Sequence, residues 1–278
     1  LPGGSAMGRP RVAFRGEPLD GSLMAAVEFR QVSFSAGGQL ILDQLSLNIE
    51  TGETLVLLGR SGAGKTTALK MVNGLLFPSM GEVLVEGRPT TSWEPIQLRR
   101  SIGYVIQEVG LFPHLTVREN VGLVPRLEGW PAERIASRTR ELLEQVDLAP
   151  EQFAGRYPRQ LSGGQRQRVG VARALAANPG LLLFDEPFGA LDPVTRLELQ
   201  NQFLELRGRL RKTCIFVTHD VREALRIGTR IALLDHGRLE TLATPEQFLK
   251  SPAPQTRAFL AVLDGEQRAK GEQPESRA

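Results

Sequence analysis

The feature that most constrains the fold of this chain is a short glycine-rich segment between an apolar run and a helical pattern. Residues 59–66 read Gly-Arg-Ser-Gly-Ala-Gly-Lys-Thr, the apolar run Thr54–Leu58 precedes them, and Pro78 ends the helical pattern that follows. A strand-to-helix turn of this kind presents backbone N–H groups and a positive helix end to one point, where both attract phosphate. The alternative is a glycine-rich turn that only happens to precede Lys-Thr. The strand before the segment and the helix after it favour a phosphate-binding loop.

The residue types of this loop each have a chemical role in holding a nucleoside triphosphate. Backbone amides would wrap the phosphates, the Lys65 ammonium would reach the β- and γ-phosphates, and the Thr66 hydroxyl would ligate Mg²⁺. The candidate phosphate contacts are Gly59, Ser61, Gly62, Ala63, Gly64, Lys65, Thr66 and Thr67.

Short apolar runs predict the strands of a buried parallel sheet. Continuous apolar runs are typical of strands buried on both faces, and they lie at residues 54–58, 181–184, 213–217 and 231–234. Residues 27–34 instead alternate apolar with polar side chains, as expected of an antiparallel strand with one exposed face.

Helical patterns lie between these runs, and the alternation favours an α/β core. Residues 132–148 are amphipathic, and Thr244-Pro245-Glu246-Gln247 predicts the capped start of a further helix. From about residue 96 to residue 178 no strongly buried strand follows the start of the stretch. This stretch therefore predicts an inserted helical subdomain.

Candidate catalytic side chains follow two of the predicted buried strands. Asp185 and Glu186 come directly after residues 181–184, and His219 follows residues 213–217. Ligands of α/β sheets bind at the carboxyl ends of strands, so these side chains are expected beside the phosphate loop. There Asp185 would hold Mg²⁺ through its water shell, and Glu186 would polarise the attacking water as a general base. A helix-capping acidic pair and a structural histidine are the alternatives.

A second helix start, Leu161-Ser162-Gly163-Gly164-Gln165, carries another candidate anion site. Its backbone N–H groups, the serine hydroxyl and the helix dipole would all attract an anion. It comes shortly before the strand that ends at Asp185 and cannot belong to the same site as the phosphate loop. The sequence therefore predicts two distinct phosphate half-sites in one chain.

Together these motifs resemble those of the nucleotide-binding subunits of ATP-binding cassette (ABC) transporters. The Leu-Ser-Gly-Gly-Gln signature, the phosphate loop, the Asp-Glu strand end, Gln107, Ala190-Leu191-Asp192 and His219 appear in family order and spacing between about Val27 and Leu263. The resemblance implies an α/β fold with a P-loop NTPase parallel-sheet core, an antiparallel β subdomain and an inserted α-helical subdomain. It places one ATPase domain at residues 25–263, with the helical insertion at about 96–178.

The resemblance also implies which residues carry Mg²⁺-dependent ATP hydrolysis. Glu186, His219 and Gln107 would be catalytic, with His219 contacting the γ-phosphate. Thr66, Gln107 and Asp185 would hold the metal, and Gln107 would relay the nucleotide state to the helical subdomain.

For the signature, the resemblance implies a role across a subunit interface. Ser162, Gly163, Gly164 and Gln165 would bind the ATP held by another subunit, and Asp192 would cross the interface. One phosphate loop and one signature per chain imply a head-to-tail dimer, formed with a second copy or with a paralogue.

One position departs from the pattern of the family. The family commonly places an aromatic residue ahead of the phosphate loop to stack on adenine, and here that residue is Ala36. Phe34 lies nearby, on the same face if the strand continues. The sequence leaves open whether Phe34, a residue of a partner chain or no ring at all covers the adenine.

A finer resemblance is to the ATPases of osmoprotectant importers, which take up glycine betaine, choline, carnitine or proline. It is carried by residues 68–81, 98–121, 157–175 and 185–199. The resemblance implies a peripheral ATPase on the cytoplasmic face of a bacterial plasma membrane. Its partners would be integral membrane permease subunits and, indirectly, a substrate-binding protein.

The same resemblance places the permease contact at residues 109–117, which would receive a coupling helix of the membrane partner. Leu111, Phe112 and Leu115 supply apolar area there. The alternative is that these three side chains belong to the core of the chain itself.

Two other classes of ABC ATPase stay open on sequence alone, lipid-trafficking systems and nucleic-acid-associated ATPases. Only the basic pI of about 9.3 favours nucleic acid, and 34 Lys and Arg barely exceed 31 Asp and Glu. Arg166, Arg168 and Arg173 are therefore interpreted as a solvated helix face or as partner contacts, and no nucleic-acid partner is expected.

The ends of the chain are predicted to be tails. Residues 1–24 are rich in Gly, Pro and Arg without periodicity, with Met24 as an alternative start of translation, and residues 264–278 are polar and unpatterned. No apolar run approaches the roughly 20 residues that a membrane helix needs. The single Cys214 excludes an internal disulfide and fits a small buried residue in a reducing compartment.

Overall fold

The computed structural model describes residues 25–107, 110–189 and 191–271, which contain two β-sheets. The smaller sheet has the strand order β2-β1-β4-β5 and is antiparallel, with β1 between β2 and β4. Its strands are β1 (Ala25–Ala36), β2 (Gln39–Glu50), β4 (Met80–Val85) and β5 (Arg88–Pro89). The antiparallel strand predicted at residues 27–34 is confirmed and is longer at both ends.

The larger sheet has the strand order β10-β9-β3-β8-β7-β6, and every neighbouring pair is parallel except β10 with β9. Its strands are β3 (Thr54–Leu58), β6 (Ile102–Val105), β7 (Leu181–Asp185), β8 (Thr213–Thr218), β9 (Arg230–Asp235) and β10 (Arg238–Ala243). Every residue of β3, β7 and β8 is buried. The four apolar runs therefore form the centre of this sheet, as their lack of alternation predicts.

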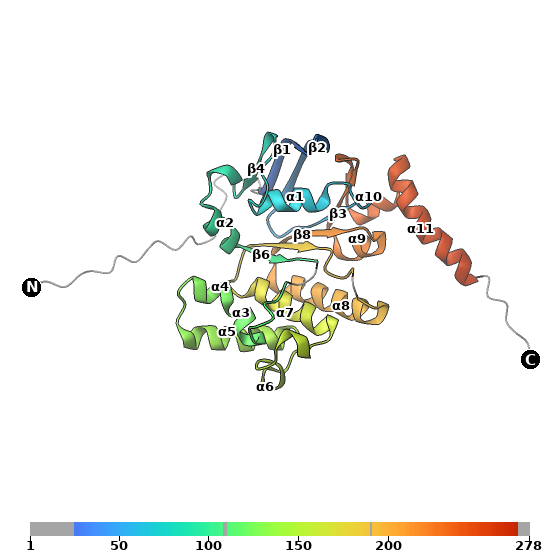
Figure 1. The fold of residues 1–278 in the computed structure, drawn as a ribbon. Helices are drawn as coiled ribbons and strands as arrows, with labels where there is room; N and C mark the ends of the chain where they lie inside the picture. The colour runs from blue at the N-terminus through green and yellow to red at the C-terminus, as the bar shows by residue number, and fades with distance from the viewer. Residues whose placement is uncertain (1–24, 108–109, 190, 272–278) are drawn as a thin grey trace, which may run out of the picture.

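Helices cover both faces of the larger sheet, and Figure 1 shows α1 on one face, between the two sheets, with α3, α5 and α7 beyond the other face. The helices are α1 (Lys65–Val72), α2 (Pro95–Ser101), α3 (Val117–Val121), α4 (Leu123–Leu127), α5 (Ala132–Gln145), α6 (Pro150–Phe153), α7 (Gly163–Leu175), α8 (Pro193–Leu210), α9 (Val221–Ile227), α10 (Pro245–Leu249) and α11 (Pro254–Gly271). None of the helices in the described ranges is long and apolar enough to cross a bilayer.

The two faces of the larger sheet build two separate cores. Leu55 and Leu57 of β3 point toward α1 and the antiparallel sheet, where they pack in one buried apolar cluster. Val56 and Leu58, which alternate with them, pack in a second cluster with α3, α5 and α7. Successive side chains of a strand point to opposite faces, so β3 and its neighbours join both cores. The phosphate loop leaves β3 at the point where these cores meet.

The boundaries of the helical insertion differ from the prediction of residues 96–178. Strand β6 lies within that range, yet it pairs with β7 as an edge strand of the larger sheet. Its run of Ile102, Gly103, Tyr104 and Val105 is short and contains a glycine, so its pattern gives little strand signal. The glycine lets α7 approach the strand, since a Cβ there would lie 2.4 Å from the Ala174 carbonyl oxygen.

Near the carboxyl end the predicted capping box is confirmed, and the predicted tail is partly wrong. The Thr244 side chain accepts from the Gln247 N–H at the start of α10. Helix α11 continues to Gly271, so residues 264–271 are helical rather than unpatterned. Arg, Lys, Gln and Glu are favourable in a helix without any apolar stripe, which explains the missed signal. The predicted tails at residues 1–24 and 272–278 lie outside the described residues.

Candidate functional site

The phosphate loop is closed around the ammonium group of its own lysine. The Lys65 Nζ donates to the carbonyl oxygens of Gly59 and Arg60, 2.9 Å from each. Gly64 has a φ of 92° and lies against β2, where a Cβ would be 2.6 Å from Leu42 Cδ2. Only glycine combines that backbone conformation with that approach. Burial lowers the pKa of Lys65, and the negative charges of Glu186 and Asp185 oppose this shift.

Two of the three residues predicted to hold the metal, Thr66 and Asp185, are brought together behind the loop. The Thr66 hydroxyl donates to Asp185 Oδ1 at 2.8 Å, and the Tyr104 hydroxyl lies 3.3 Å from Asp185 Oδ2. Burial, with the nearby Asp185 charge, raises the pKa of Tyr104 above its ordinary value, so its hydroxyl stays protonated and can donate. Hydroxyl and carboxylate oxygens are ligands that Mg²⁺ prefers, so this pair fits that ion.

Tyr104 is a site residue that sequence reasoning missed. It lies near the carboxyl end of β6, and β6 pairs with β7 so that Tyr104 is opposite Leu183. Its hydroxyl reaches the carboxylate at the end of the neighbouring strand. Its position three residues before Gln107 would have indicated Tyr104, but only if β6 had been recognised as a strand of the larger sheet.

The predicted general base and the predicted histidine are in direct contact. Glu186 Oε2 and His219 Nδ1 lie 3.1 Å apart, with the Glu186 side chain 20% exposed and the His219 side chain 60% exposed. Glu186 has a φ of 45°, a left-handed conformation that is uncommon for a residue with a Cβ. Its N–H donates to the Val217 carbonyl and its own carbonyl accepts from the Gly189 N–H, at 3.0 and 3.1 Å. These bonds hold the Glu186 backbone in its otherwise unfavourable conformation.

These groups surround one open hollow of about 810 Å³. Its lining residues are Gln39, Leu40, Ile41, Arg60, Ser61, Gly62, Ala63, Gly64, Lys65, Thr66, Thr67, Gln107, Glu186, His219 and Phe259. The structure thus brings the phosphate loop, Gln107, Glu186 and His219 to one place, as the strand-end argument predicts. Asp185 lies behind Thr66 rather than in the lining.

The signature lies elsewhere, at the start of α7. The Ser162 hydroxyl accepts from the Gln165 N–H at 3.2 Å, and Gln165 Oε1 accepts from the Ser162 N–H at 3.0 Å, which forms a capping box. Gly164 is required by packing, since its Cβ would lie 2.6 Å from Thr195 Cγ2 on α8. A Cβ at Gly163 would meet no atom of the described residues closer than 3.6 Å. Packing within the chain therefore explains Gly164 but not Gly163.

Asp192 is the cap of α8. Its carboxylate accepts from the N–H groups of Val194 and Thr195 at 3.1 and 3.0 Å. Hydrogen bonds from Thr195 and Val194 hold its pKa below the usual range. The cap gives Asp192 a role within the chain, and its predicted role across an interface stays a prediction. Ala190, next to it in the sequence motif, lies outside the described residues.

The interpretation of the α7 arginines as a solvated face is wrong for Arg168 and Arg173, which are half-buried, whereas Arg166 is exposed. The alternative, that these arginines contact a partner, stays a prediction. Arg166 donates to the Leu161 carbonyl at 2.8 Å, Arg168 to the Val146 carbonyl at 3.1 Å, and Arg173 to the Gly110 carbonyl at 2.6 Å. All three side chains tie α7 to neighbouring backbone. Every residue has a backbone carbonyl whatever its side chain, so the sequence gives no sign of which carbonyls these arginines bind.

In the segment after Gln107, Leu111 packs against the core while Phe112 is exposed. Leu111 packs against the cluster formed with α7, whereas Phe112 is 42% exposed and Leu115 is half-buried. The fully buried Asn120 pins the segment, accepting from the Phe112 N–H at 2.8 Å and donating to the Leu115 carbonyl at 3.0 Å. Leu111 therefore agrees with the interpretation that these side chains belong to the core, whereas Phe112 lies at the surface, where a partner could contact it. Val109 lies outside the described residues.

An open hollow of about 300 Å³ lies beside this exposed phenylalanine. Arg99 and Arg100 line one part of it, and Phe112, Leu123 and Val124 supply apolar surface. Arg173, which also lines it, links this surface to α7 and hence to the signature helix.

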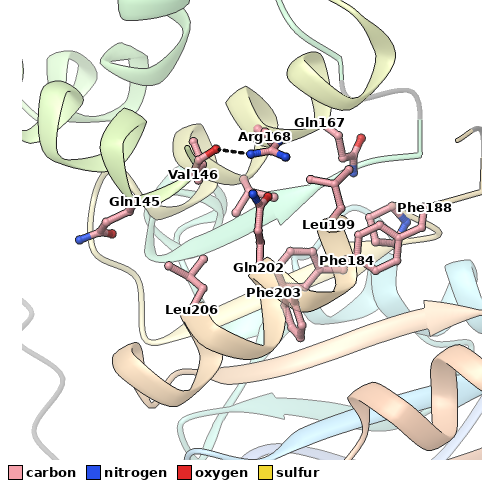
Figure 2. Close-up of a pocket in the computed structure, with 12 residues that line it drawn as sticks. Gln145, Val146, Gln167, Arg168, Phe184, Phe188, Leu199, Gln202, Phe203 and Leu206 are labelled. Atoms are coloured by element: carbon pink, nitrogen blue, oxygen red, sulfur yellow. Dashed lines mark hydrogen bonds between the residues drawn. The ribbon is translucent and has the colours of Figure 1, made fainter. Parts of the chain in front are cut away.

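A much smaller cavity, of about 30 Å³, lies between α5, α7, α8 and strand β7 (Figure 2). Figure 2 shows Phe184 and Phe203 close together with Gln202 beside them, and Gln145 and Gln167 also line the cavity. Gln145 Oε1, Gln167 Nε2 and Gln202 Oε1 are buried and have no hydrogen-bond partner among the residues that the structure describes. This cavity is separate from the lining of the larger hollow.

Comparison with known proteins agrees with the motifs. Residues 42–189 match the family model described as ABC transporter. The chain is 48% identical over 232 residues to the glycine betaine/carnitine/choline transport ATP-binding protein OpuCA of Bacillus subtilis, covering 84% of this chain and 60% of that protein. It is also 48% identical over 227 residues to the osmoprotectant import ATP-binding protein OsmV of Salmonella typhimurium, covering 82% of this chain and 59% of that protein. The chain thus spans about 60% of the length of these relatives.

A solved structure shares the fold over most of the chain. It is the dimeric post-hydrolysis state of the ATP-binding cassette MJ0796 bound to ADP and Pi, with a TM-score of 0.71 and 36% sequence identity. The match covers 79% of this chain and 98% of the other. The predicted parallel core with an antiparallel sheet and inserted helices is therefore confirmed, and this chain belongs to the ABC transporter family.

Proposed function

We propose that this chain is the ATP-hydrolysing subunit of an ABC importer for quaternary-amine osmoprotectants. The observation that carries the proposal is the single hollow in which the phosphate loop meets Gln107, Glu186 and His219. The substrate class rests on the names of the relatives, which include glycine betaine, carnitine and choline transport proteins.

Nucleotide binding would use the buried lysine first. Lys65 Nζ, now held by the Gly59 and Arg60 carbonyls, would turn to the β- and γ-phosphates while backbone N–H groups of the loop wrap them. Thr66 and Asp185, with Gln107, would hold Mg²⁺, which neutralises phosphate charge when bound. The hydrogen bond between Thr66 and Asp185 supports this assignment, because it brings two oxygen ligands together.

Hydrolysis would depend on the contact between Glu186 and His219. Glu186 would accept a proton from the water that attacks the γ-phosphorus, while the bond to the leaving ADP oxygen breaks. His219, 3.1 Å from Glu186 Oε2, would fix the direction of that carboxylate and reach the γ-phosphate with its other ring nitrogen.

A second subunit would complete the site. Ser162, Gly163 and Gln165 lie outside the lining of the hollow, and packing among the described residues gives Gly163 no reason to be a glycine. Position 163 would need a glycine if its backbone must come close to a phosphate that another subunit binds. We therefore assign the signature to the nucleotide held by a second copy or a paralogue, with Asp192 at the interface.

The permease would dock beside Phe112. The hollow there combines exposed apolar side chains with Arg99 and Arg100, and the bond between Arg173 and Gly110 connects it to α7. Such a contact would hold the chain peripherally at the cytoplasmic face of a bacterial membrane, with a substrate-binding protein as an indirect partner.

The test is reconstitution with the permease and the substrate-binding protein that this chain is proposed to serve, in vesicles that contain ATP and Mg²⁺. Uptake of radiolabelled glycine betaine or choline that needs ATP, and that the Glu186→Gln chain does not support, is the expected result. ATP hydrolysis by the purified chain that is independent of Mg²⁺ would contradict the assigned chemistry. Uptake of lipid in place of quaternary amines would move the chain to another class of ABC system.

A further inference from the structure

The hollow has a polar end and an apolar wall, and the proposed ATPase chemistry uses only the polar end. Lys65, Glu186 and His219 lie with the phosphate loop, whereas Leu40, Ile41 and Phe259 also line the hollow. A nucleoside triphosphate carries an apolar base at the end opposite its γ-phosphate. The apolar wall is therefore the part of the hollow that suits the base.

Neither candidate from the sequence lines this hollow. Ala36 is exposed at the end of β1, paired with Gln39 across a turn of two glycines. Phe34 is half-buried and packs against the cluster between the antiparallel sheet and α1. A ring that is packed in the core has little face to offer a base.

Phe259 has the opposite placement, although it is far from the loop in sequence. Its ring packs against the second apolar cluster and also lines the hollow. One part of the ring is thus fixed by the core while another part borders the nucleotide space. Leu40, which is 52% exposed and pairs with Ser35 next to Ala36, completes the wall on the β2 side.

Two neighbours in α11 anchor the helix beside Phe259. Thr256 is fully buried, and its hydroxyl lies 2.9 Å from the Thr241 hydroxyl of β10. Because it lies three residues before Phe259, it shares that face of the helix. Leu260, the next residue after Phe259, is 8% exposed and packs in the core cluster, which holds the adjoining face of α11 against the sheet.

We infer that Phe259 and Leu40 form the base-binding wall of the hollow, in place of the missing ring at position 36. The inference rests on the proposed nucleotide-binding function and names the residues that hold the base. An aromatic ring binds a base by stacking whatever its identity. Helix α11 is thereby part of the nucleotide site, and undocking of α11 would weaken ATP binding.

The experiment compares ATP with inorganic tripolyphosphate, which has the phosphates but no base. Both are titrated calorimetrically into the full chain carrying Glu186→Gln, so that ATP is not consumed. Phe259→Ala in that background should weaken ATP binding by about 5- to 150-fold, the range that corresponds to base stacking. Tripolyphosphate binding should stay unchanged, and Phe259→Tyr should restore ATP affinity.

Controls separate this inference from the function on which it rests. Leu249→Ala removes a side chain that is 49% exposed on the neighbouring α10 and does not line the hollow, and it should change neither affinity. Equal loss of ATP and tripolyphosphate binding in Phe259→Ala, or no loss of either, would overturn the base wall. Failure of the parent chain to bind tripolyphosphate and ATP would instead overturn the proposed function.

Discussion

The nucleotide hollow and the small glutamine-lined cavity both lie at the carboxyl end of strand β7, and they are built in opposite ways. At the carboxyl end of β7, Asp185 is held by Thr66 and Tyr104, and Glu186 contacts His219. Each of these partners comes from a different element. Such bonds fix polar groups before a substrate arrives, which is what preorganised chemistry requires.

Around the small cavity, by contrast, some polar atoms have no partner in the described part of the chain. Gln145, Gln167 and Gln202 come from α5, α7 and α8, and each has one buried amide atom without a hydrogen bond to those residues. A cavity of about 30 Å³ has room for about two water molecules, which could pair these atoms. The strand end therefore carries a rigid region of paired polar groups, while the joint between the core and the helical insertion is a polar seam with unpaired amide atoms.

The largest expected effect concerns the rigid region. Glu186→Gln keeps the shape of the side chain but removes the proposed base, so turnover should fall by about 10²- to 10⁴-fold while ATP binding is retained. Steady-state hydrolysis and equilibrium ATP binding measure the two quantities. Turnover within a few-fold of the parent chain would mean that another residue is the base. The carboxyl end of β7 would then not be the catalytic part of the site.

A pair of glycine substitutions tests whether the signature serves packing or a partner. Gly164→Val forces a side chain against Thr195 and should lower the free energy of unfolding by about 1–3 kcal/mol, as overpacking does. Gly163→Ala has space and should leave that free energy within about 0.5 kcal/mol. It should nevertheless reduce hydrolysis, because it blocks approach to a second subunit's nucleotide. Denaturant unfolding and hydrolysis assays together distinguish the two roles, and full activity of Gly163→Ala would remove the second.

The polar seam should tolerate a change that the core does not. Gln167→Met replaces an amide with an unpaired nitrogen by an apolar chain of similar size, so the free energy of unfolding should change by less than about 1.5 kcal/mol. Phe184→Ala, on the other side of the same cavity, should cost about 3–5 kcal/mol. Urea titrations of the two variants measure this contrast. Equal losses would show that Gln167 is as firmly packed as Phe184.

The sequence predicts the rigid region well because its signals are local. Four continuous apolar runs give the buried strands, and the glycine-rich turn and the acids at the strand end follow directly from them. Gly64 is required both by its φ of 92° and by contact with β2, and such positions leave the residue type little freedom.

The remaining parts depend on contacts that leave no pattern in the sequence. Arg168 and Arg173 bind backbone carbonyls, and a carbonyl is present at every residue whatever its side chain. Strand β6 is too short to show its period, although Tyr104 within it completes the acidic strand end. Phe259 lines the nucleotide hollow because the tertiary structure places α11 beside the hollow. No sequence motif links Phe259 to the phosphate loop.

The smallest expected effect comes from restoring the ring that the family commonly has. From the sequence alone, Ala36→Tyr should tighten ATP binding by about 5- to 150-fold, because a stacked base gains roughly 1–3 kcal/mol. If Phe259 already covers one face of the base, a second ring adds less, and we expect a gain below about threefold. In the Phe259→Ala chain the same Ala36→Tyr change should gain much more, since the base then has no other ring. Titration of ATP into the four combinations gives the coupling between the two positions, and strictly additive effects would mean that the two rings do not share the base.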